Sequence, residues 1–302
     1  MTPLPSTDLP ATDQQAWSRY WAAVAPEAAG CLPGLPGSIA GLFESRWSAY
    51  FRSLPRGALV LDLGTGGGAV PRLAASLDLG LKLVGVDYAD VVPVNDDPGI
   101  EYRGRVDMRA LPFVDGHFDA VTSQFSIEYV GMEAVDELLR VLSDRGSFMI
   151  IAHHADSVVL DQNRKRLLAL EGLLAEGGIV QSARIAVDAG RERDQATRHD
   201  LAGQLKALRL QPEGQGVVEE ISGLVARMML EPDARAGLQW LHSQARMEQV
   251  RLRALSAAAL DESSVAALRA RLARPGRAVS CNVMSAPELG MPIAWHLQSP
   301  AW

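Results

Sequence analysis

Apolar residues recur at helical spacing over the first fifty residues of the chain and then change to short continuous runs. Trp17, Tyr20 and Trp21 fall on one face of a helix predicted over residues 13–29, and a second apolar face predicts a helix over residues 38–53. A stretch rich in proline and glycine separates the two predicted helices. From residue 58 onward the apolar runs are short, which is typical of strands that are buried on both faces.

Strands and helices then alternate up to residue 152. The pattern predicts strands over residues 58–63, 81–86, 100–102, 119–123 and 147–152. Helices are predicted over residues 69–77 and 132–142, and Asp144 to Gly146 is predicted to form a turn. Alternation at this spacing indicates an α/β fold with a mostly parallel sheet that is covered by helices on both faces.

The alternation stops after His154. Residues 156–274 show helical periodicity, and Asp261 is the predicted N-cap of the last helix. Two further strand-like runs, over residues 278–284 and 292–298, predict an antiparallel hairpin that completes a seven-stranded sheet. A large all-helical insertion is therefore expected between the fifth and sixth strands.

This pattern divides the chain into three expected parts. They are N-terminal helices or a lid over residues 1–55, a sheet domain made of residues 56–154 and 276–302, and the helical insertion over residues 155–275. The insertion is expected to act as a substrate cap or as a dimerisation surface, because a sheet needs no such block for its own closure.

Composition and charge exclude several classes of function. The chain of 302 residues is 48% apolar and 22% charged, with a net charge of -7, as in ordinary globular proteins. The insertion is nearly neutral and the remainder is acidic, so we expect no nucleic-acid partner. No apolar run is long enough to cross a membrane. Two distant cysteines and six histidines without metal-site spacing predict a cytoplasmic protein without a bound metal.

A glycine-rich turn follows the first predicted strand. Its glycines are Gly64, Gly66 and Gly68, and such a turn at a helix N-terminus lets the backbone approach a polar ligand. Asp62 precedes the turn by two residues and would repel the pyrophosphate of a dinucleotide, whereas a ligand that carries cationic groups tolerates it. Asp87 ends the next strand, where a carboxylate binds ribose hydroxyls.

These segments resemble the class I S-adenosylmethionine-dependent methyltransferase superfamily, in its small-molecule group. Asp62-x-Gly64-x-Gly66-x-Gly68 resembles the first motif of the superfamily, and Asp87 matches its ribose-binding acid. Three further segments are similar to family segments, namely residues 106–113, 118–125 and 293–297. Residues 138–146 resemble the approach to strand five but lack the usual proline. The resemblance covers residues 56–154 and about 277–299, and it implies a Rossmann-like sheet.

The resemblance also implies the cofactor and the residues that bind it. The cofactor would be S-adenosyl-L-methionine, with S-adenosyl-L-homocysteine as the product. Gly64 and Gly66 would line the methionine part, and Asp107 would bind the adenine amino group with Met108 against the ring. The expected cofactor-binding residues are Asp62, Gly64, Thr65, Gly66, Gly68, Asp87, Tyr88, Asp107, Met108, Gln124 and Phe125.

Candidate catalytic residues follow the fourth and fifth strands. His153 and His154 come directly after strand five, and Glu128 and Tyr129 follow strand four, so all four are expected at the carboxyl edge of the sheet. A hydroxyl or thiol acceptor needs a base to remove its proton, and one histidine or Glu128 is a candidate for that role. The alternative is that the histidines are loop or capping residues and that Tyr129 is packed.

The aromatic residues of the first helix and the helical insertion are candidate substrate elements. Trp17, Tyr20 and Trp21 are expected either to close over the sulfonium cation, which aromatic faces suit, or to pack as helix core. The insertion is expected to select a small, moderately hydrophobic organic acceptor, or to form a homodimer. Methylation on oxygen is favoured over nitrogen or carbon.

Three other functions stay open at this point. A cyclase or similar enzyme that binds S-adenosylmethionine without transferring a methyl group would carry the same motifs, as would a sensor or scaffold that lacks activity. An NAD-dependent enzyme is disfavoured by Asp62 and by the segment at Asp107.

Overall fold

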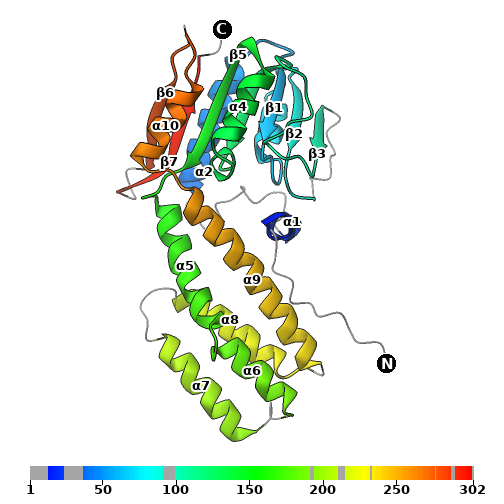
Figure 1. Cartoon of the computed structure of the whole chain (residues 1–302), viewed down its shortest axis with the longest axis vertical. Helices are drawn as coiled ribbons and strands as arrows, with labels where there is room; N and C mark the ends of the chain where they lie inside the picture. The colour runs from blue at the N-terminus through cyan, green and yellow to red at the C-terminus, as the bar shows by residue number, and fades with distance from the viewer. Residues whose placement is uncertain are drawn as a thin grey trace. The chain divides into compact units, whose positions relative to one another are not determined.

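The computed structural model describes residues 13–23, 37–90, 99–190, 194–209, 215–231, 233–275, 277–286 and 290–300. The chain forms two compact units (Figure 1). A sheet unit contains residues 17–160 and 255–302, and a helical unit contains residues 161–254 together with the chain up to residue 16. The chain thus leaves the sheet unit after the fifth strand and returns to it before the last two strands.

The described residues of the sheet unit form seven strands. They are β1 (Leu59–Leu63), β2 (Lys82–Val86), β3 (Ile100–Arg103), β4 (Phe118–Gln124), β5 (Leu142–His153), β6 (Ser280–Ala286) and β7 (Met291–Gln298). Their order in the sheet is β3-β2-β1-β4-β5-β7-β6. The first five strands are parallel, and β7 runs antiparallel to both β5 and β6. The strand order reverses between β1 and β4, and the carboxyl ends at such a reversal are where open α/β sheets bind ligands.

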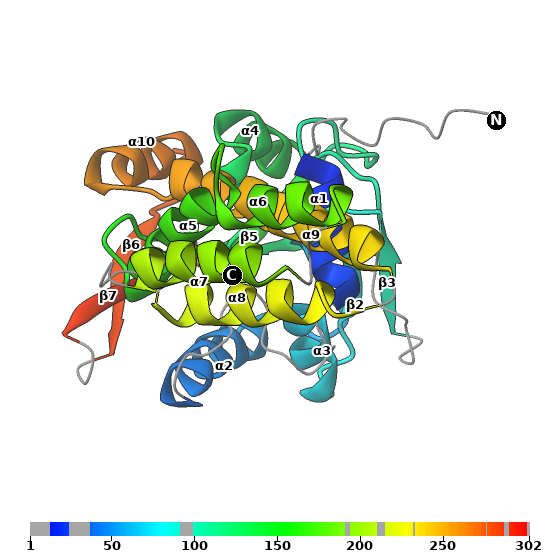
Figure 2. The same ribbon diagram turned by 90° about the horizontal axis from the view of Figure 1, so that it is seen from below.

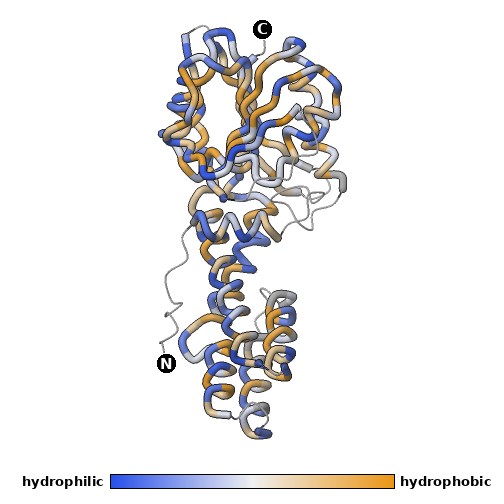
Figure 3. The backbone as a smooth tube through the Cα atoms, turned by 90° about the vertical axis from the view of Figure 1, so that its right-hand side faces the viewer, coloured by the Kyte–Doolittle hydropathy of each residue, from blue (hydrophilic) through white to orange (hydrophobic). Residues whose placement is uncertain are grey.

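Helices cover both faces of this sheet. Figure 2 shows α4 (Met132–Val141) and α10 (Glu262–Leu272) on one face, and α2 (Gly37–Arg52) and α3 (Ala69–Ser76) on the other. The amphipathic pattern of α4 explains its packing, because its buried residues Ala134, Val135, Leu138 and Val141 share one side of the helix. The strands are apolar along most of their length (Figure 3), as expected for strands covered on both sides.

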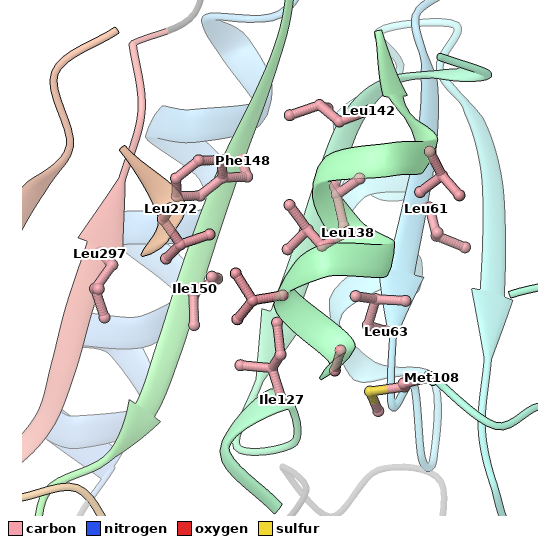
Figure 4. Packing of buried hydrophobic residues seen from close by; sticks show 14 of the residues in the cluster. Leu61, Leu63, Met108, Ile127, Leu138, Leu142, Phe148, Ile150, Leu272 and Leu297 are labelled. Carbon is pink, nitrogen blue, oxygen red and sulfur yellow. The ribbon is translucent and has the colours of Figure 1, made fainter. Parts of the chain in front are cut away.

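Each face of the sheet has its own hydrophobic core. On the α4 face, Leu138 packs among Leu61 and Leu63 of β1, Phe148 and Ile150 of β5, and Leu272 of α10 (Figure 4). On the α2 face, aromatic residues of the helix pack with strand residues such as Val60 and Met149. The aromatic residues are Phe43, Trp47, Tyr50 and Phe51. The sheet is therefore held rigidly between two packed layers.

Two short elements flank the carboxyl edge of the sheet. Helix α1 (Asp13–Ala23) lies before the sheet in the chain, and the 3-10 turn η1 (Ile127–Tyr129) follows β4. The Ser18 hydroxyl of α1 accepts a hydrogen bond from the Asp90 backbone N–H at 2.9 Å, just after β2. This contact attaches the second half of α1 to the sheet unit.

The helical unit is tied together by ion pairs. It consists of α5 (Val158–Leu174), α6 (Ile179–Asp188), α7 (Gln195–Arg209), α8 (Gln215–Met228) and α9 (Ala234–Ala258), of which α5 and α9 extend into the sheet unit. Arg166 of α5 contacts Glu248 of α9 and Glu220 of α8. Arg253 and Arg235 join α9 to α5 and α6 through Glu171 and Asp188. No described helix is long and apolar enough to cross a membrane.

The predicted fold class is confirmed, including the antiparallel final pair and the helical segment between β5 and the last two strands. Asp261 caps α10 as predicted, because its side chain accepts from the Ser264 N–H at 2.7 Å. The predicted turn at Asp144 to Gly146 is wrong, since β5 begins at Leu142 and runs through it. Residues 24–29 of the first predicted helix, and the break that follows, lie outside the described residues.

The structure also refines the expected extent of the insertion. The sequence predicts that the insertion ends at residue 275, whereas the compact helical unit ends at residue 254. Helix α10 packs in the core of the sheet unit through Val265, Leu268 and Leu272. The physical reason is that α10 covers sheet surface beside α4, so its apolar residues are buried there.

Met149 is fully buried in the core on the α2 face, whereas Met132, the first residue of α4, is 42% exposed. We expect Met149→Ala to lower the free energy of unfolding by about 2–5 kcal/mol, because it leaves a cavity in a packed core. Met132→Ala is the matched control and should change the value by about 0.5 kcal/mol or less. Urea denaturation of both variants measures this, and equal effects would contradict the packing described above.

Candidate functional site

The ends of four parallel strands bring the candidate residues to one edge of the sheet. β1 ends at Leu63, β2 at Val86, β4 at Gln124 and β5 at His153. Parallel strands have their carboxyl ends on the same side, so the segments that follow them are neighbours although they are distant in sequence. This edge contains the glycine turn, the carboxylates after β1 and β2, and the residues of η1.

The glycine turn after β1 is closely packed. The Thr65 N–H donates to the Val86 carbonyl at 2.9 Å, which ties the turn to the end of β2. Gly64 and Gly66 have φ values of 64° and 51°, in the left-handed region that favours glycine. A Cβ atom on Gly64 would overlap Ser126 and Met108, and one on Gly66 would overlap the indole of Trp21. The turn therefore requires glycine both for its backbone and for its neighbours.

Asp87 holds this turn through its carboxylate. Its Oδ2 accepts from the Gly66 N–H at 2.7 Å, and its Oδ1 accepts from the Ala89 N–H at 2.8 Å. Burial raises the pKa of Asp87, and these backbone hydrogen bonds partly offset the rise. The Tyr88 backbone N–H also donates to this carboxylate, which leaves acceptor capacity for a further donor such as a ribose hydroxyl.

Asp62 lies fully buried beside this carboxylate. In the sheet it pairs with Thr122 of β4, and the Thr122 hydroxyl donates to Asp62 Oδ1 at 2.7 Å. Burial raises the pKa of Asp62 to about 7, the hydroxyls of Thr122 and Thr65 lower it, and the charge of Asp87 raises it. Two buried carboxylates close together favour a ligand with positive charge and disfavour a phosphate.

The residues expected around an adenine ring lie on the neighbouring strand ends. Met108 is buried, and its Cε borders Gly64. Asp107 is partly exposed and forms a bidentate ion pair with Arg109, at 3.0 and 2.7 Å, which lowers the pKa of Asp107. Tyr88 is 40% exposed directly after Asp87. An adenine amino group would have to share the Asp107 oxygens with Arg109.

The residues at the end of β4 and just after it contact either α2 or the glycine turn. Gln124 accepts a hydrogen bond from the Trp47 indole at 2.6 Å, which holds its side chain against α2. Phe125 is buried and has a φ of 54°, unusual for a residue other than glycine. The structure adds Ser126, whose hydroxyl donates to the Leu63 carbonyl at 2.6 Å and borders Gly64. In the sequence, the position of Ser126 three residues after Ser123 is the only signal for this contact with the glycine turn.

Aromatic residues of α1 lie against the same edge. Trp17 packs edge to face on Tyr129, with ring centroids 5.3 Å apart, and Tyr20 packs on both Trp17 and Trp21. The Trp21 indole borders Gly66 and Gly67. Helix α1 thus contacts both the glycine turn and η1.

Glu128 and His153 form a buried pair at this edge. Glu128 Oε1 lies 2.6 Å from His153 Nδ1 and accepts from the His153 backbone N–H at 2.9 Å. The His153 ring also contacts Phe125, at 4.3 Å between ring centroids, and Tyr129, at 5.8 Å. Two of the candidate catalytic residues therefore meet, with Tyr129 beside them.

His154 does not join them. Its ring stacks on Trp295 of β7 at 4.4 Å between centroids, and its Nδ1 accepts from the Asp156 N–H at 3.0 Å. Consecutive residues of a strand point to opposite faces, which explains why the two adjacent histidines separate. Burial lowers the pKa of His154. His154 therefore packs on β7 and accepts a hydrogen bond in the turn that follows β5, and its role as a candidate base stays a prediction.

The described residues include no group of three or more histidine, cysteine, aspartate or glutamate side chains arranged to hold a metal ion.

Residues 61–150 match a protein-family model described as a methyltransferase domain. The match includes the glycine turn, both buried carboxylates and the turn that carries Glu128. This segment is therefore similar to methyltransferase domains, which is the assignment that the sequence resemblance implies. The strand order of the sheet agrees with that assignment.

Two curated proteins are similar to the chain over part of their length. A demethylmenaquinone methyltransferase of Thermus thermophilus is 34% identical over 100 residues, which are 30% of this chain and 46% of that protein. A ubiquinone/menaquinone biosynthesis C-methyltransferase of Geotalea uraniireducens is 29% identical over 137 residues, which are 41% of this chain and 57% of that protein. The chain spans about half the length of the curated relatives it matches.

Solved structures are also similar to part of the chain. A geranyl diphosphate C-methyltransferase of Streptomyces coelicolor A3(2) is 18% identical with a TM-score of 0.37, over 48% of this chain and 66% of that one. An S-adenosylmethionine-dependent methyltransferase of Aquifex aeolicus is 20% identical with a TM-score of 0.31, over 37% of this chain and 65% of that one.

The raised pKa of Asp62 predicts how stability depends on pH. From pH 3.8, the ordinary value, to about 7, the unfolded chain has lost the Asp62 proton while the folded chain keeps it. Stability therefore falls as pH rises through this range, by at most about 1.4 kcal/mol per pH unit. Asp62→Asn has no carboxyl proton to lose. The free energy of unfolding of this variant minus that of the unmodified chain should therefore increase from pH 4 to pH 7 and stay constant above pH 7.

Urea denaturation at several pH values measures this difference. Asp78→Asn is the matched control at an exposed position, and its difference from the unmodified chain should not vary with pH. A pH-independent difference for Asp62→Asn would mean that Asp62 is not buried as a carboxylic acid.

Proposed function

We propose that the chain transfers a methyl group from S-adenosylmethionine to a small organic acceptor at the carboxyl edge of the sheet. The observation that carries the proposal is the pair of buried carboxylates, Asp62 and Asp87, around a glycine turn. S-adenosylmethionine carries an ammonium and a sulfonium group and no phosphate, so it suits a negative site. Asp62 disfavours the pyrophosphate of NAD for the same reason.

The proposed contacts follow from the positions of the side chains. Asp87 would bind the ribose hydroxyls with its remaining lone pairs, and Gly64 and Gly66 would line the methionine part. Met108 would lie against the adenine ring, with Asp107 at its amino group. When bound, the cofactor supplies a methyl group on a positively charged sulfur, and the faces of Trp17, Tyr20 and Trp21 suit that charge.

For the methylated atom we propose a hydroxyl oxygen. The buried His153 imidazole at the same edge supports this, because a hydroxyl acceptor needs its proton removed. A ring carbon is the second candidate, favoured by the names of the relatives that act on quinones or are C-methyltransferases. Methylation of nitrogen has no specific observation in its favour.

The helical unit is proposed to select the acceptor. Its described residues include large apolar side chains that are exposed, namely Leu168, Ile185, Leu230 and Trp240. Such residues suit contact with a moderately hydrophobic compound, and they equally suit a homodimer interface. Sedimentation of the full chain over a range of concentrations separates a monomer from a dimer.

Cofactor binding is the first expected outcome. The full chain should bind S-adenosylmethionine and S-adenosylhomocysteine with micromolar affinity and should not bind NAD. Asp87→Asn should weaken binding about 10-fold to 100-fold, because it removes a charged acceptor from the ribose site. Calorimetric titration measures this, with the exposed Asp144→Asn as the matched control. Preferential binding of NAD would overturn the proposal.

Methyl transfer is the second expected outcome. Incubation with S-adenosylmethionine and a panel of hydroxylated aromatic compounds should yield S-adenosylhomocysteine and a product heavier by one CH2 group, both detected by mass spectrometry. The methyl ether of each compound, which lacks the hydroxyl, is its matched control. Tight binding without any acceptor-dependent S-adenosylhomocysteine would favour a cyclase or a sensor instead.

A further inference from the structure

Glu128 and His153 meet through a single carboxylate oxygen. Glu128 Oε1 accepts from the His153 backbone N–H at 2.9 Å and lies 2.6 Å from His153 Nδ1. The two side chains are 0% and 1% exposed. The same oxygen therefore fixes both the end of β5 and the orientation of the imidazole ring.

The other polar atom of each side chain has no partner. Within the described part of the chain, neither Glu128 Oε2 nor His153 Nε2 makes a hydrogen bond, although both are buried. Buried polar atoms in proteins are nearly always bonded. Two such atoms in one pair, at the edge where α/β sheets bind ligands, point to a group that the protein itself does not supply.

The bond to Glu128 fixes the chemistry of the imidazole. A carboxylate only accepts hydrogen bonds, so Nδ1 carries the hydrogen that it donates to Oε1. In the neutral ring Nε2 then bears a lone pair. Both unpartnered atoms are therefore acceptors, and a complementary ligand has to donate hydrogen.

We infer that His153 is the base that takes a hydroxyl proton from the methyl acceptor, and that Glu128 positions His153 for this step. The inference rests on the proposed function and narrows the acceptor to a neutral compound with a hydroxyl group on a planar ring. An anionic acceptor is excluded by the buried charge of Glu128, because the only donors to its side chain among the described residues are the N–H groups of the neutral His153.

The surrounding rings select the planar shape. Phe125 lies 4.3 Å from the His153 ring at an angle of 30°, and Tyr129 contacts it edge on at 5.8 Å. A planar aromatic acceptor that reached Nε2 would meet these two rings and pack against them. Because His153 is buried, the acceptor reaches Nε2 only after a neighbouring side chain moves, and Phe125 and Tyr129 are aromatic neighbours in contact with the ring.

The step is balanced by one proton transfer and one methyl transfer. The O–H bond of the acceptor breaks and its proton moves to Nε2. The electron pair of the oxygen forms the new O–CH3 bond while the S–CH3 bond breaks, and that pair of electrons stays on sulfur as a neutral thioether. The imidazolium left on His153 is stabilised by Glu128 and then releases its proton to water.

4-Nitrophenol is a suitable probe because its phenolate absorbs where the phenol does not. We expect the full chain with S-adenosylhomocysteine to bind it and to raise phenolate absorbance at a pH below the pKa of free 4-nitrophenol. His153→Asn should abolish this rise. His296→Asn is the matched control, since His296 is another buried histidine, on β7, whose charged neighbour is Arg46, and it should keep the rise. 4-Nitroanisole and 4-nitrobenzoate should bind about 10-fold or more weakly.

Turnover of 4-nitrophenol gives a second readout. His153→Asn should lower kcat about 100-fold or more while the affinity for S-adenosylhomocysteine stays unchanged. In a plot of kcat against pH, activity falls at low pH when His153 is protonated. Glu128→Gln should move this fall to lower pH, because the imidazolium loses the negative charge beside it. The titratable groups in contact with the ring are Glu128 and Tyr129, so Tyr129→Phe shows whether the fall belongs to the pair. A purely structural pair would lower activity without moving the fall.

Three results would overturn the inference. They are a phenolate rise or turnover in His153→Asn equal to that of the unmodified chain, equal binding of 4-nitroanisole, and failure of the unmodified chain to bind 4-nitrophenol when S-adenosylhomocysteine is bound. Failure to bind S-adenosylhomocysteine itself would instead overturn the proposed function, so the two failures are distinguishable.

Discussion

The carboxylate of Asp87 accepts hydrogen bonds from the backbone of Gly66 and Ala89, and the geometry of the ligand-binding edge depends on this contact. It fixes the glycine turn after β1 to the end of β2. It also buries a negative charge next to Asp62, which is itself held by Thr122. Burying two acidic groups without a cation is costly and raises the pKa of Asp62 to about 7, so the same contact that shapes the turn makes it favourable for a positively charged ligand to bind there.

The sheet was predictable because its strands are buried on both faces. A run such as Leu59 to Leu63 is apolar at every position except Asp62, and this distinguishes it from an amphipathic helix even in a single sequence. The glycine turn was predictable for a related reason, since Gly64 and Gly66 occupy backbone conformations that other residues rarely adopt. Once strands and turns are in order, parallel pairing brings Asp62 and Asp87 to the same edge.

Other features depend on tertiary contacts that no local pattern reveals. Helix α10 has the same periodicity as the helices before it, and only its packing against α4 assigns it to the sheet unit. β5 extends back to Leu142 because that residue pairs with Phe118, although Asp144 to Gly146 has the composition of a turn. His153 and His154 are chemically identical in the sequence, and they separate because adjacent strand residues face opposite sides. Ser126 borders Gly64 although the two residues lie far apart in the sequence.

The stability of the fold explains only part of the Glu128–His153 pair. β5 makes its last pairing with β4 at Ile151, so the His153 N–H needs another acceptor, and Glu128 Oε1 supplies it. The bond to the His153 N–H explains the position of Glu128 Oε1. It does not account for an imidazole whose Nε2 is buried without a partner in the described chain, nor for the second carboxylate oxygen in the same state. Each such atom costs about 1–3 kcal/mol, and an apolar residue at position 153 would avoid the cost on that side while its backbone N–H kept the bond to Glu128. The pair therefore lowers the stability of the fold at the ligand-binding edge. A reaction with an acceptor bound at this edge explains why the pair is present.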